Sequence, residues 1–413
     1  MMAQLQTTLR VVSEESSLSI KDAFAEAFLI AETIATHAKV DGERIYWVTC
    51  AYDPHLHKRR LQPMSFRLYD GICGTAVFLA AAAKIFDSPT FRSLAVKALR
   101  GIRATAKANS RELFQYGIGA AIGVSSAVYA LSTAGEMLAC PELLDDAQAV
   151  VAAFTSDDIT SDRSLDLLSG AAGCLLCLLR LYRLRPQANT LSLAVRCGEH
   201  LLAQRTLSPA GFLAWATVKG QLRSGFAHGA AGICYALIEL YSVTGDERFL
   251  AAAVEGREFE NSLYSEEHTN WLSGPRALPS PNRWCNGSAG IGLGRLASLS
   301  MFPDESHVAD IERALDITSR PASTVLDYPC CGNLGLIELH LAASQYLRFP
   351  HAREQAEFVT NQVIQKARLF GHYGLESGET VYNPSFHQGM AGIGHQLLRF
   401  AIPDQTPSVL LWR

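Results

Sequence analysis

The sequence predicts an all-α protein, an α/α toroid of seven helical hairpins with seven inner and seven outer helices. Three observations support this fold: a recurring Gly-x-x-Gly motif, an apolar segment of helical length after each motif, and an amphipathic segment before the next one. Their spacing ranges from 45 residues (Gly287 to Gly332) to 59 residues (Gly170 to Gly229), which is room for two helices per repeat. The first glycines stand at positions 71, 119, 170, 229, 287, 332 and 389.

The chain before the first motif, residues 1–60, is expected to be a leading helical segment packed on the ring. Residues 61–413 are expected to form the toroid as one domain. The chain has 413 residues, of which 48% are hydrophobic and 18% charged, so it can bury a large core.

The segments that follow the motifs are expected to be the inner helices. Two examples are "YDGICGTAVFLAAAA" from Tyr69 and "FAHGAAGICYALIELY" from Phe226. Each is apolar nearly all round, which indicates burial on every side. The second motif is degenerate, with three residues between Gly119 and Gly123. We expect glycine at these positions because it permits a backbone turn that other residues resist, and because it lets neighbouring helices approach closely.

The segments before the motifs are expected to be the outer helices. "DSPTFRSLAVKALRGIRATAKA" and "DERFLAAAVEGREFENSLYS" place Arg, Lys and Glu on one face, and "DSPT" and "TGDE" supply N-cap residues. An open solenoid needs polar capping repeats at its ends. The first and last inner segments here are as apolar as the middle ones, so the sequence favours a closed ring.

Charge and composition argue against several partners. The net charge is −4, and the densest basic run is "HKRR" at 57–60, so neither nucleic acid nor an anionic membrane surface is expected to bind. The sequence contains no apolar run of membrane-spanning length, and its N-terminus lacks the layout of a signal peptide. We therefore expect a cytoplasmic protein whose ten cysteines are reduced, with any special ones metal-binding or reactive.

The motif loops all open on one end of such a ring, so residues beside the glycines converge. Cys285, Cys330 and Cys331 precede two successive motifs by one or two residues, and they can offer three thiolates to one metal with a fourth position open. The alternatives are three buried structural cysteines, or a vicinal disulfide between Cys330 and Cys331. Cys174 and Cys177, flanked by leucines in "GCLLCLLRLY", are expected in the core.

Four further polar residues are candidates for the site. His228 in "AHG" is a candidate acid/base, or it caps its loop. Asp166, four residues before Gly170, orients or charge-stabilises His228, or it caps a helix. Arg283 is a candidate to stabilise negative charge near the metal. His387 is a candidate to contact the substrate or a metal ligand. The alternative for each is an ordinary polar loop residue. Two more histidines lie within inner helices and are expected in the core, namely His340 and His395.

The motifs "AHGAAG", "WCNGSAG" and "CCGNLG" resemble the lanthionine synthetase C family, the cyclases of lanthipeptide biosynthesis, from about Leu61 to Phe400. The resemblance implies an α/α toroid that carries Zn²⁺. It also implies addition of a cysteine thiol of a dehydrated precursor peptide, leader plus core, to dehydroalanine or dehydrobutyrine, which closes a thioether ring. The implied residues are the zinc ligands Cys285, Cys330 and Cys331, the catalytic His228, and Asp166.

Two features depart from the commoner family pattern. "CCG" stands where Cys-His-Gly is usual, so the third ligand becomes Cys331, as in a subset of cyclase domains of dehydratase-fused synthetases. The family's arginine, four residues before the first zinc cysteine, is Pro281 here, which leaves Arg283 as the candidate. We expect either a free-standing cyclase or a domain cut from a larger synthetase, with a dehydratase domain or protein as the candidate partner.

Two other function classes are alternatives. Protein prenyltransferases also pair an α/α ring with a thiol-activating zinc, but their repeat signature differs and their zinc uses a carboxylate and a histidine beside one cysteine. A non-catalytic zinc protein that binds a peptide or glutathione is the second alternative. Incubation with a dehydrated precursor peptide, followed by thiol alkylation, distinguishes a cyclase from a binder.

Overall fold

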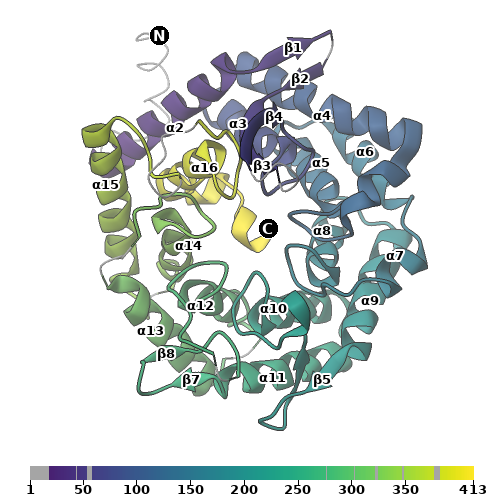
Figure 1. Cartoon of the computed structure of the whole chain (residues 1–413), viewed down its shortest axis with the longest axis vertical. Helices are drawn as coiled ribbons and strands as arrows, with labels where there is room; N and C mark the ends of the chain where they lie inside the picture. Colours follow the sequence, from purple (N-terminus) through teal and green to yellow (C-terminus); the bar gives the residue numbers. More distant parts are fainter. Residues whose placement is uncertain are drawn as a thin grey trace.

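The computed structural model describes residues 18–413 except 43, 54–57, 276, 302, 321–323, 347 and 376–381. In this part of the chain seven inner helices form a closed ring, because each packs against the next and α16 packs against α3 (Figure 1). The inner helices are α3 (Ile72–Ile85), α5 (Ser125–Met137), α8 (Ala171–Leu184), α10 (Ala230–Thr244), α12 (Ser288–Ala297), α14 (Asn333–Ala343) and α16 (Met390–Ala401). The predicted α/α toroid is therefore confirmed.

An outer helix packs against each inner helix. Six of them follow their inner helix in sequence, whereas the seventh, α2 (Leu18–Thr36), packs against α16 and joins the two ends of the chain. The six are α4 (Pro89–Asn109), α6 (Pro141–Val151), α9 (Ala188–Ala203), α11 (Glu247–Asn261), α13 (Glu305–Ser319) and α15 (Ala352–Phe370). The predicted N-cap in "TGDE" is Asp246, whose carboxylate accepts from the Arg248 N–H at 3.0 Å.

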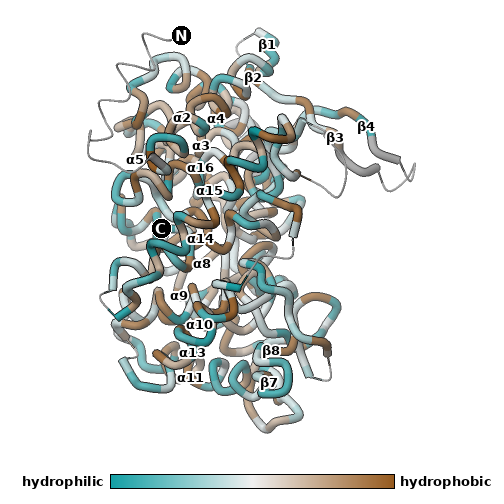
Figure 2. Tube along the Cα trace, turned by 90° about the vertical axis from the view of Figure 1, so that its left-hand side faces the viewer, coloured by the Kyte–Doolittle hydropathy of each residue, from teal (hydrophilic) through white to brown (hydrophobic). Residues whose placement is uncertain are grey.

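The segment expected to be a helical leader contains α2 but also strands. These strands form antiparallel hairpins, and the hairpin of β3 and β4 projects from one face of the ring (Figure 2). The expectation of helix is thus right for α2 and wrong where the described residues before position 61 form strands, while residues 1–17 lie outside the described residues and the domain boundary at residue 60 stays a prediction. The strands of this segment are β1 (Lys39–Asp41), β2 (Arg44–Tyr46), β3 (Val48–Asp53) and β4 (Lys58–Pro63). Two further hairpins lie later in the chain, β5 (Arg205–Leu207) with β6 (Leu213–Trp215), and β7 (Tyr264–Ser265) with β8 (Asn270–Trp271).

The burial of the inner helices follows their composition. Every residue of α10 from Ala230 to Leu240 is buried, whereas the buried residues of its outer partner α11 are spaced along one face. An apolar helix in the inner ring has neighbours on all sides, but an outer helix keeps one face in water. Among the described residues, no helix combines the length and hydropathy that a bilayer span requires.

The motif glycines are required by close approach and not by an unusual backbone turn. Gly229, which caps α10, has an extended backbone with φ −123° and ψ −170°, accessible to any residue. A Cβ atom placed there would lie 2.2 Å from the carbonyl oxygen of Ser224 in the preceding loop. The expectation that glycine permits an unusual backbone turn is wrong at this position. Glycine is required because the loop folds back onto the start of its own helix and leaves no room for a side chain.

Backbone hydrogen bonds join the seven motif loops into a closed circuit at one end of the ring. The circuit uses residues two or three positions before the glycine that precedes each inner helix, which is Gly123 for α5. It therefore fixes these residues relative to one another. The bonds are Tyr69 N–Ala121 O (2.9 Å), Ala120 N–Leu167 O (3.1 Å), Leu167 N–Ala227 O (3.2 Å), Ala227 N–Cys285 O (2.9 Å), Cys285 N–Cys330 O (3.4 Å), Cys330 N–His387 O (3.0 Å) and His387 N–Tyr69 O (3.0 Å).

The C-terminal residues lie in the middle of the ring (Figure 1). The Tyr235 hydroxyl donates to the carbonyl of Leu411 at 3.0 Å, and the Trp284 indole donates to that of Leu410 at 3.3 Å. Trp412 is buried, with its ring centroid 6.0 Å from that of Trp284. The C-terminal segment thus packs beneath the loop that carries Cys285.

Candidate metal centre and active site

Three of the predicted site residues form one cluster. Sγ of Cys331 lies 3.4 Å from Sγ of Cys285 and 3.4 Å from Sγ of Cys330, and all three sulfurs lie within 4.8 Å of one another. Cys285 and Cys330 are buried, whereas Cys331 is half-buried. No disulfide joins Cys330 to Cys331, so the cluster presents three free thiols, one of them toward solvent.

Each thiol of the cluster has a polar or charged side chain beside it from outside the cluster. The Tyr69 hydroxyl donates to Cys330 Sγ at 3.2 Å, and Asn286 Nδ2 lies 3.8 Å from Cys285 Sγ. The Arg283 guanidinium lies near Cys331 and lowers the pKa of its thiol. These side chains around three sulfurs favour negative charge on the cluster.

The pKa values of the three thiols are shifted in different directions. Hydrogen bonds from Cys285 and Cys330, with the nearby charge of Arg283, lower the pKa of Cys331. Hydrogen bonds to the other two thiols, together with burial, raise the pKa of Cys330. In the metal-free protein the first thiolate therefore forms at Cys331, the most exposed of the three.

His228 and Asp166 form a second polar pair. Nδ1 of His228 lies 2.6 Å from Oδ2 of Asp166, whose other oxygen accepts the Ser169 N–H at 2.7 Å. The Asp166 side chain is 3% exposed and that of His228 is 25% exposed, so the carboxylate is enclosed and the imidazole reaches solvent. Because Ala227 N bonds the carbonyl of Cys285 at 2.9 Å, the His228 loop lies beside the cysteine cluster.

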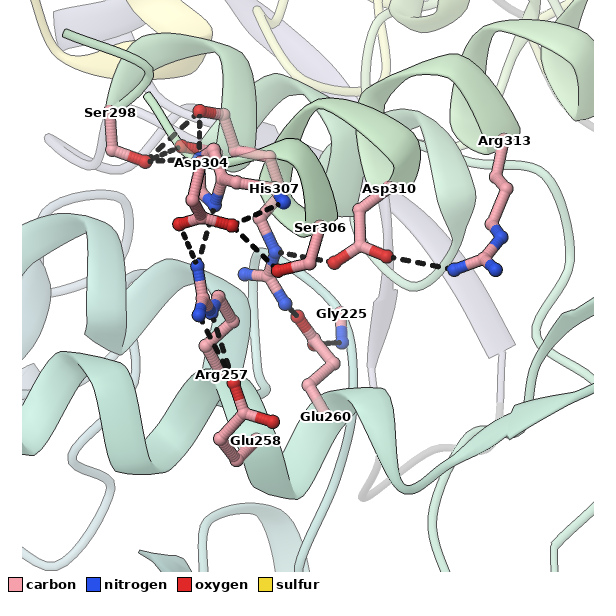
Figure 3. A network of polar contacts seen from close by, with 12 residues as sticks. Gly225, Arg257, Glu258, Glu260, Ser298, Asp304, Ser306, His307, Asp310 and Arg313 are labelled. Carbon is pink, nitrogen blue, oxygen red and sulfur yellow. Dashed lines mark hydrogen bonds and ion pairs between the residues drawn. The ribbon is translucent and has the colours of Figure 1, made fainter. Parts of the chain in front are cut away.

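A buried polar network supports the His228 loop (Figure 3). Gly225 has φ 103°, a conformation that favours glycine, and its N–H donates to Oε1 of Glu260 at 2.9 Å. The other oxygen of Glu260 accepts from Arg295 at 2.9 Å, and Arg295 also contacts Asp310 at 3.4 Å. Glu260 on α11 thus connects the loop of His228 with α12, the helix that follows Cys285.

Replacing Glu260 with alanine is expected to lower the free energy of unfolding by about 3–5 kcal/mol, because Arg295 stays buried with Asp310 as its remaining carboxylate. Urea unfolding measures the change. The matched control is Glu312→Ala, which breaks an exposed pair with Arg348 and should cost about 1 kcal/mol or less. An equal loss of unfolding free energy in the two variants would show that the buried network stabilises the fold no more than an exposed ion pair does.

The remaining candidates lie away from solvent. His387 is fully buried, stacks on the ring of Tyr69 and lies beside Trp284, so its ring contacts Tyr69, whose hydroxyl hydrogen-bonds Cys330. Burial lowers the pKa of His387 to about 3, so its imidazole is neutral. The prediction that four residues belong to the core is confirmed, since all are buried: Cys174, Cys177, His340 and His395.

Sequence reasoning missed Tyr69 and Asn286. A signal for both was present, because Tyr69 precedes its motif by two residues, as Cys285 and Cys330 do, and Asn286 precedes its motif by one, as Cys331 does. Aligning the motifs by their first glycine would have placed these five residues in the same layer of the ring.

Comparisons with known proteins identify the family and the fold of the chain. Residues 62–411 match the family described as lanthionine synthetase C-like protein. Among solved structures the chain is similar to nisin cyclase, with a TM-score of 0.65 and 20% sequence identity over 84% of this chain and 92% of that one. No curated protein sequence matches it.

More distant likenesses include cellobiose 2-epimerase from Bacillus thermoamylovorans B4167 (TM-score 0.45, 14% identity, 82% of this chain and 99% of that one). Another is unsaturated glucuronyl hydrolase from Streptococcus agalactiae (TM-score 0.48, 12% identity, 95% and 98%). The family match covers nearly the whole toroid, and the likeness to nisin cyclase extends to its architecture. The chain therefore belongs to the lanthionine synthetase C-like family.

Proposed function

We propose that this protein is a zinc-dependent lanthionine synthetase. It adds cysteine thiols of a dehydrated precursor peptide to dehydroalanine and dehydrobutyrine residues, which closes thioether rings. The observation that carries the proposal is the three-thiol cluster beside the Asp166–His228 pair on the neighbouring loop. Family membership and the nisin cyclase fold support it.

The donor set of the cluster fits zinc. Tetrahedral zinc about 2.3 Å from each sulfur needs sulfurs about 3.8 Å apart. The cluster meets this requirement, with two separations of 3.4 Å and all three sulfurs within 4.8 Å. When bound by Cys285, Cys330 and Cys331, zinc supplies positive charge and an open fourth position, which lower the pKa of an arriving thiol. The cluster contains neither the carboxylate nor the histidine of the prenyltransferase site.

His228 is the proposed acid/base. The Asp166 carboxylate accepts the Nδ1–H, which leaves the Nε2 lone pair free to take the proton of the peptide thiol. The S–Cβ bond then forms, the Cα–Cβ π bond breaks, and His228 or a water that it holds returns a proton to Cα. Atoms and electrons balance, and the reaction needs neither oxidant nor reductant.

Arg283 is proposed to act on the charge that this addition creates. Negative charge builds on the carbonyl oxygen next to Cα as the sulfur adds to Cβ. The guanidinium of Arg283 lies beside Cys331, the most exposed ligand, so it is placed to stabilise that oxygen. Arg283 would thus replace the family arginine, at whose position this chain has Pro281.

The proposed partner is the dehydrated precursor peptide, leader plus core, supplied by a dehydratase domain or protein. The proposed compartment is the cytoplasm, because the cluster requires reduced thiols. The alternative, a non-catalytic relative that binds a peptide or glutathione, would use the same cluster without ring closure.

Thiol alkylation of a dehydrated peptide tests the proposal. Ring closure leaves the peptide mass unchanged but removes its free thiols. After incubation with the zinc-loaded protein, the peptide should therefore take up fewer alkyl groups by mass spectrometry. The same peptide before dehydration is the control, and it should keep all its thiols. A dehydrated peptide that binds, yet is alkylated at every cysteine, would favour the non-catalytic alternative.

Replacing Cys331 with histidine is expected to keep zinc bound but to slow cyclisation by about three- to tenfold, within about 1.4 kcal/mol. Three thiolates give the site a formal charge of −1, whereas two thiolates and an imidazole give 0, so the peptide thiolate should be less nucleophilic in the variant.

Cyclisation rates for one dehydrated peptide, compared at matched zinc occupancy, measure this change. Cys140→Ser is the control, because Cys140 is half-buried outside the cluster and hydrogen-bonds Glu142. An equal or faster Cys331→His variant would show that the third thiolate gives no electronic advantage.

A further inference from the structure

Tyr69 hydrogen-bonds a proposed ligand, yet the proposed chemistry does not use it. Its hydroxyl donates to Cys330 Sγ at 3.2 Å across 261 positions of sequence. Tyr69 stands two residues before Gly71, the first glycine of the first motif, and Cys330 stands two residues before Gly332. The repeat register therefore delivers both side chains to the same layer of the ring.

The position of the Tyr69 ring is fixed on several sides. It stacks on the ring of His387, with centroids 4.9 Å apart and planes 10° from parallel. The backbone bonds His387 N–Tyr69 O and Cys330 N–His387 O, both 3.0 Å long, join the three residues in order. The ring centroid of Trp284 lies 5.6 Å from that of His387. The phenol therefore reaches across a buried, neutral imidazole to Cys330, and it is anchored by groups outside the thiol cluster.

We propose that Tyr69 is a positioning residue of the metal centre, whose hydroxyl holds the Cys330 sulfur in place and withdraws electron density from it. This inference rests on the proposed zinc site at Cys285, Cys330 and Cys331. It adds a group to that site that neither binds the metal nor touches the substrate.

The hydroxyl matters because Cys330 is buried. Its side chain is 2% exposed, so water cannot replace a lost donor without rearrangement. Hydrogen bonds to an ionised acceptor are about twice as strong as neutral ones. Asn286 contacts Cys285 at the longer distance of 3.8 Å, and Arg283 lies near Cys331. Tyr69 is therefore the side chain from outside the cluster that donates to Cys330.

Tyr69→Phe isolates the hydroxyl, because phenylalanine keeps the ring and its stack on His387. Zinc affinity, measured by competition with a chromophoric chelator, should fall about 10- to 100-fold. In the cobalt-substituted protein, the sulfur-to-cobalt charge-transfer band should move to longer wavelength, because a thiolate without its hydrogen bond is a stronger electron donor. The band is informative because a loss of fold stability alone does not shift it.

Tyr373→Phe is the matched control. Tyr373 is buried, and its hydroxyl donates to Glu26 at 3.0 Å, so this variant also loses one buried hydrogen bond but leaves the thiol cluster intact. Its zinc affinity and cobalt spectrum should equal those of the wild type. An unmoved band in Tyr69→Phe would overturn the inference, even with weaker zinc binding. A wild type that binds neither metal would instead overturn the proposed function.

Discussion

Replacing His228 with phenylalanine is expected to slow ring closure by about 10²–10⁴-fold while zinc stays bound. Phenylalanine fills the space of the imidazole but cannot carry a proton between the thiol and Cα. His228 is not a member of the cluster, whose three sulfur atoms lie within 4.8 Å of one another, so zinc should keep its ligands in the variant. Single-turnover alkylation measures the rate, and elemental analysis measures zinc per chain.

Two further variants sharpen this test. Asp166→Asn should slow the reaction less, because the imidazole remains but loses the carboxylate that fixes its tautomer at 2.6 Å. His268→Phe, at an exposed histidine between β7 and β8, should change nothing. Loss of zinc in His228→Phe would mean that His228 is a ligand, and an unchanged rate would mean that the proton comes from another group.

Replacing Cys285 with alanine is expected to abolish stable zinc binding and, with it, cyclisation. The site would keep Cys330 and Cys331 alone, and structural and catalytic zinc sites use at least three protein ligands. Zinc content after dialysis against a mild chelator should fall from about one per chain to near zero. Circular dichroism should still report a helical fold, because the ring is held by packed helices that do not include the cluster.

Cys177→Ala is the control for this loss. Cys177 is also a buried cysteine, but it lies on α8 among leucines, outside the thiol cluster. This variant should keep its zinc and its activity, with at most a small loss of stability. Zinc retained in Cys285→Ala, or lost in Cys177→Ala, would contradict the assignment of the ligands.

The repeat in the sequence predicts most of the architecture and the place of the cluster. An apolar helix after each motif has to be buried, and a motif at the start of each inner helix has to open on the same end. Residues one or two positions before the glycines, such as Cys285, Cys331 and His228, are thereby brought together. Asp166 lies outside that register, and its contact with His228 depends on the loop conformation.

Other features depend on contacts that no local pattern encodes. The repeat register places Tyr69 and Cys330 in one layer of the ring, but the hydrogen bond between them depends on their side-chain rotamers, which the motif does not specify. The packing of α2 against α16 requires the two ends of the chain to meet. From the sequence, Glu260 is an acidic residue on an outer helix and would be expected in solvent. It is buried instead, because Arg295 and the Gly225 N–H donate hydrogen bonds to its carboxylate.

X-ray absorption at the zinc edge of the wild-type protein, in buffer free of thiols, tests the central claim most directly, because it counts the sulfur atoms around the metal. We expect about one zinc per chain with three sulfur ligands near 2.3 Å and one lighter atom at the open position. A folded wild type without zinc, or a zinc whose shell has nitrogen in place of one sulfur, would contradict the assignment of Cys285, Cys330 and Cys331 as its ligands.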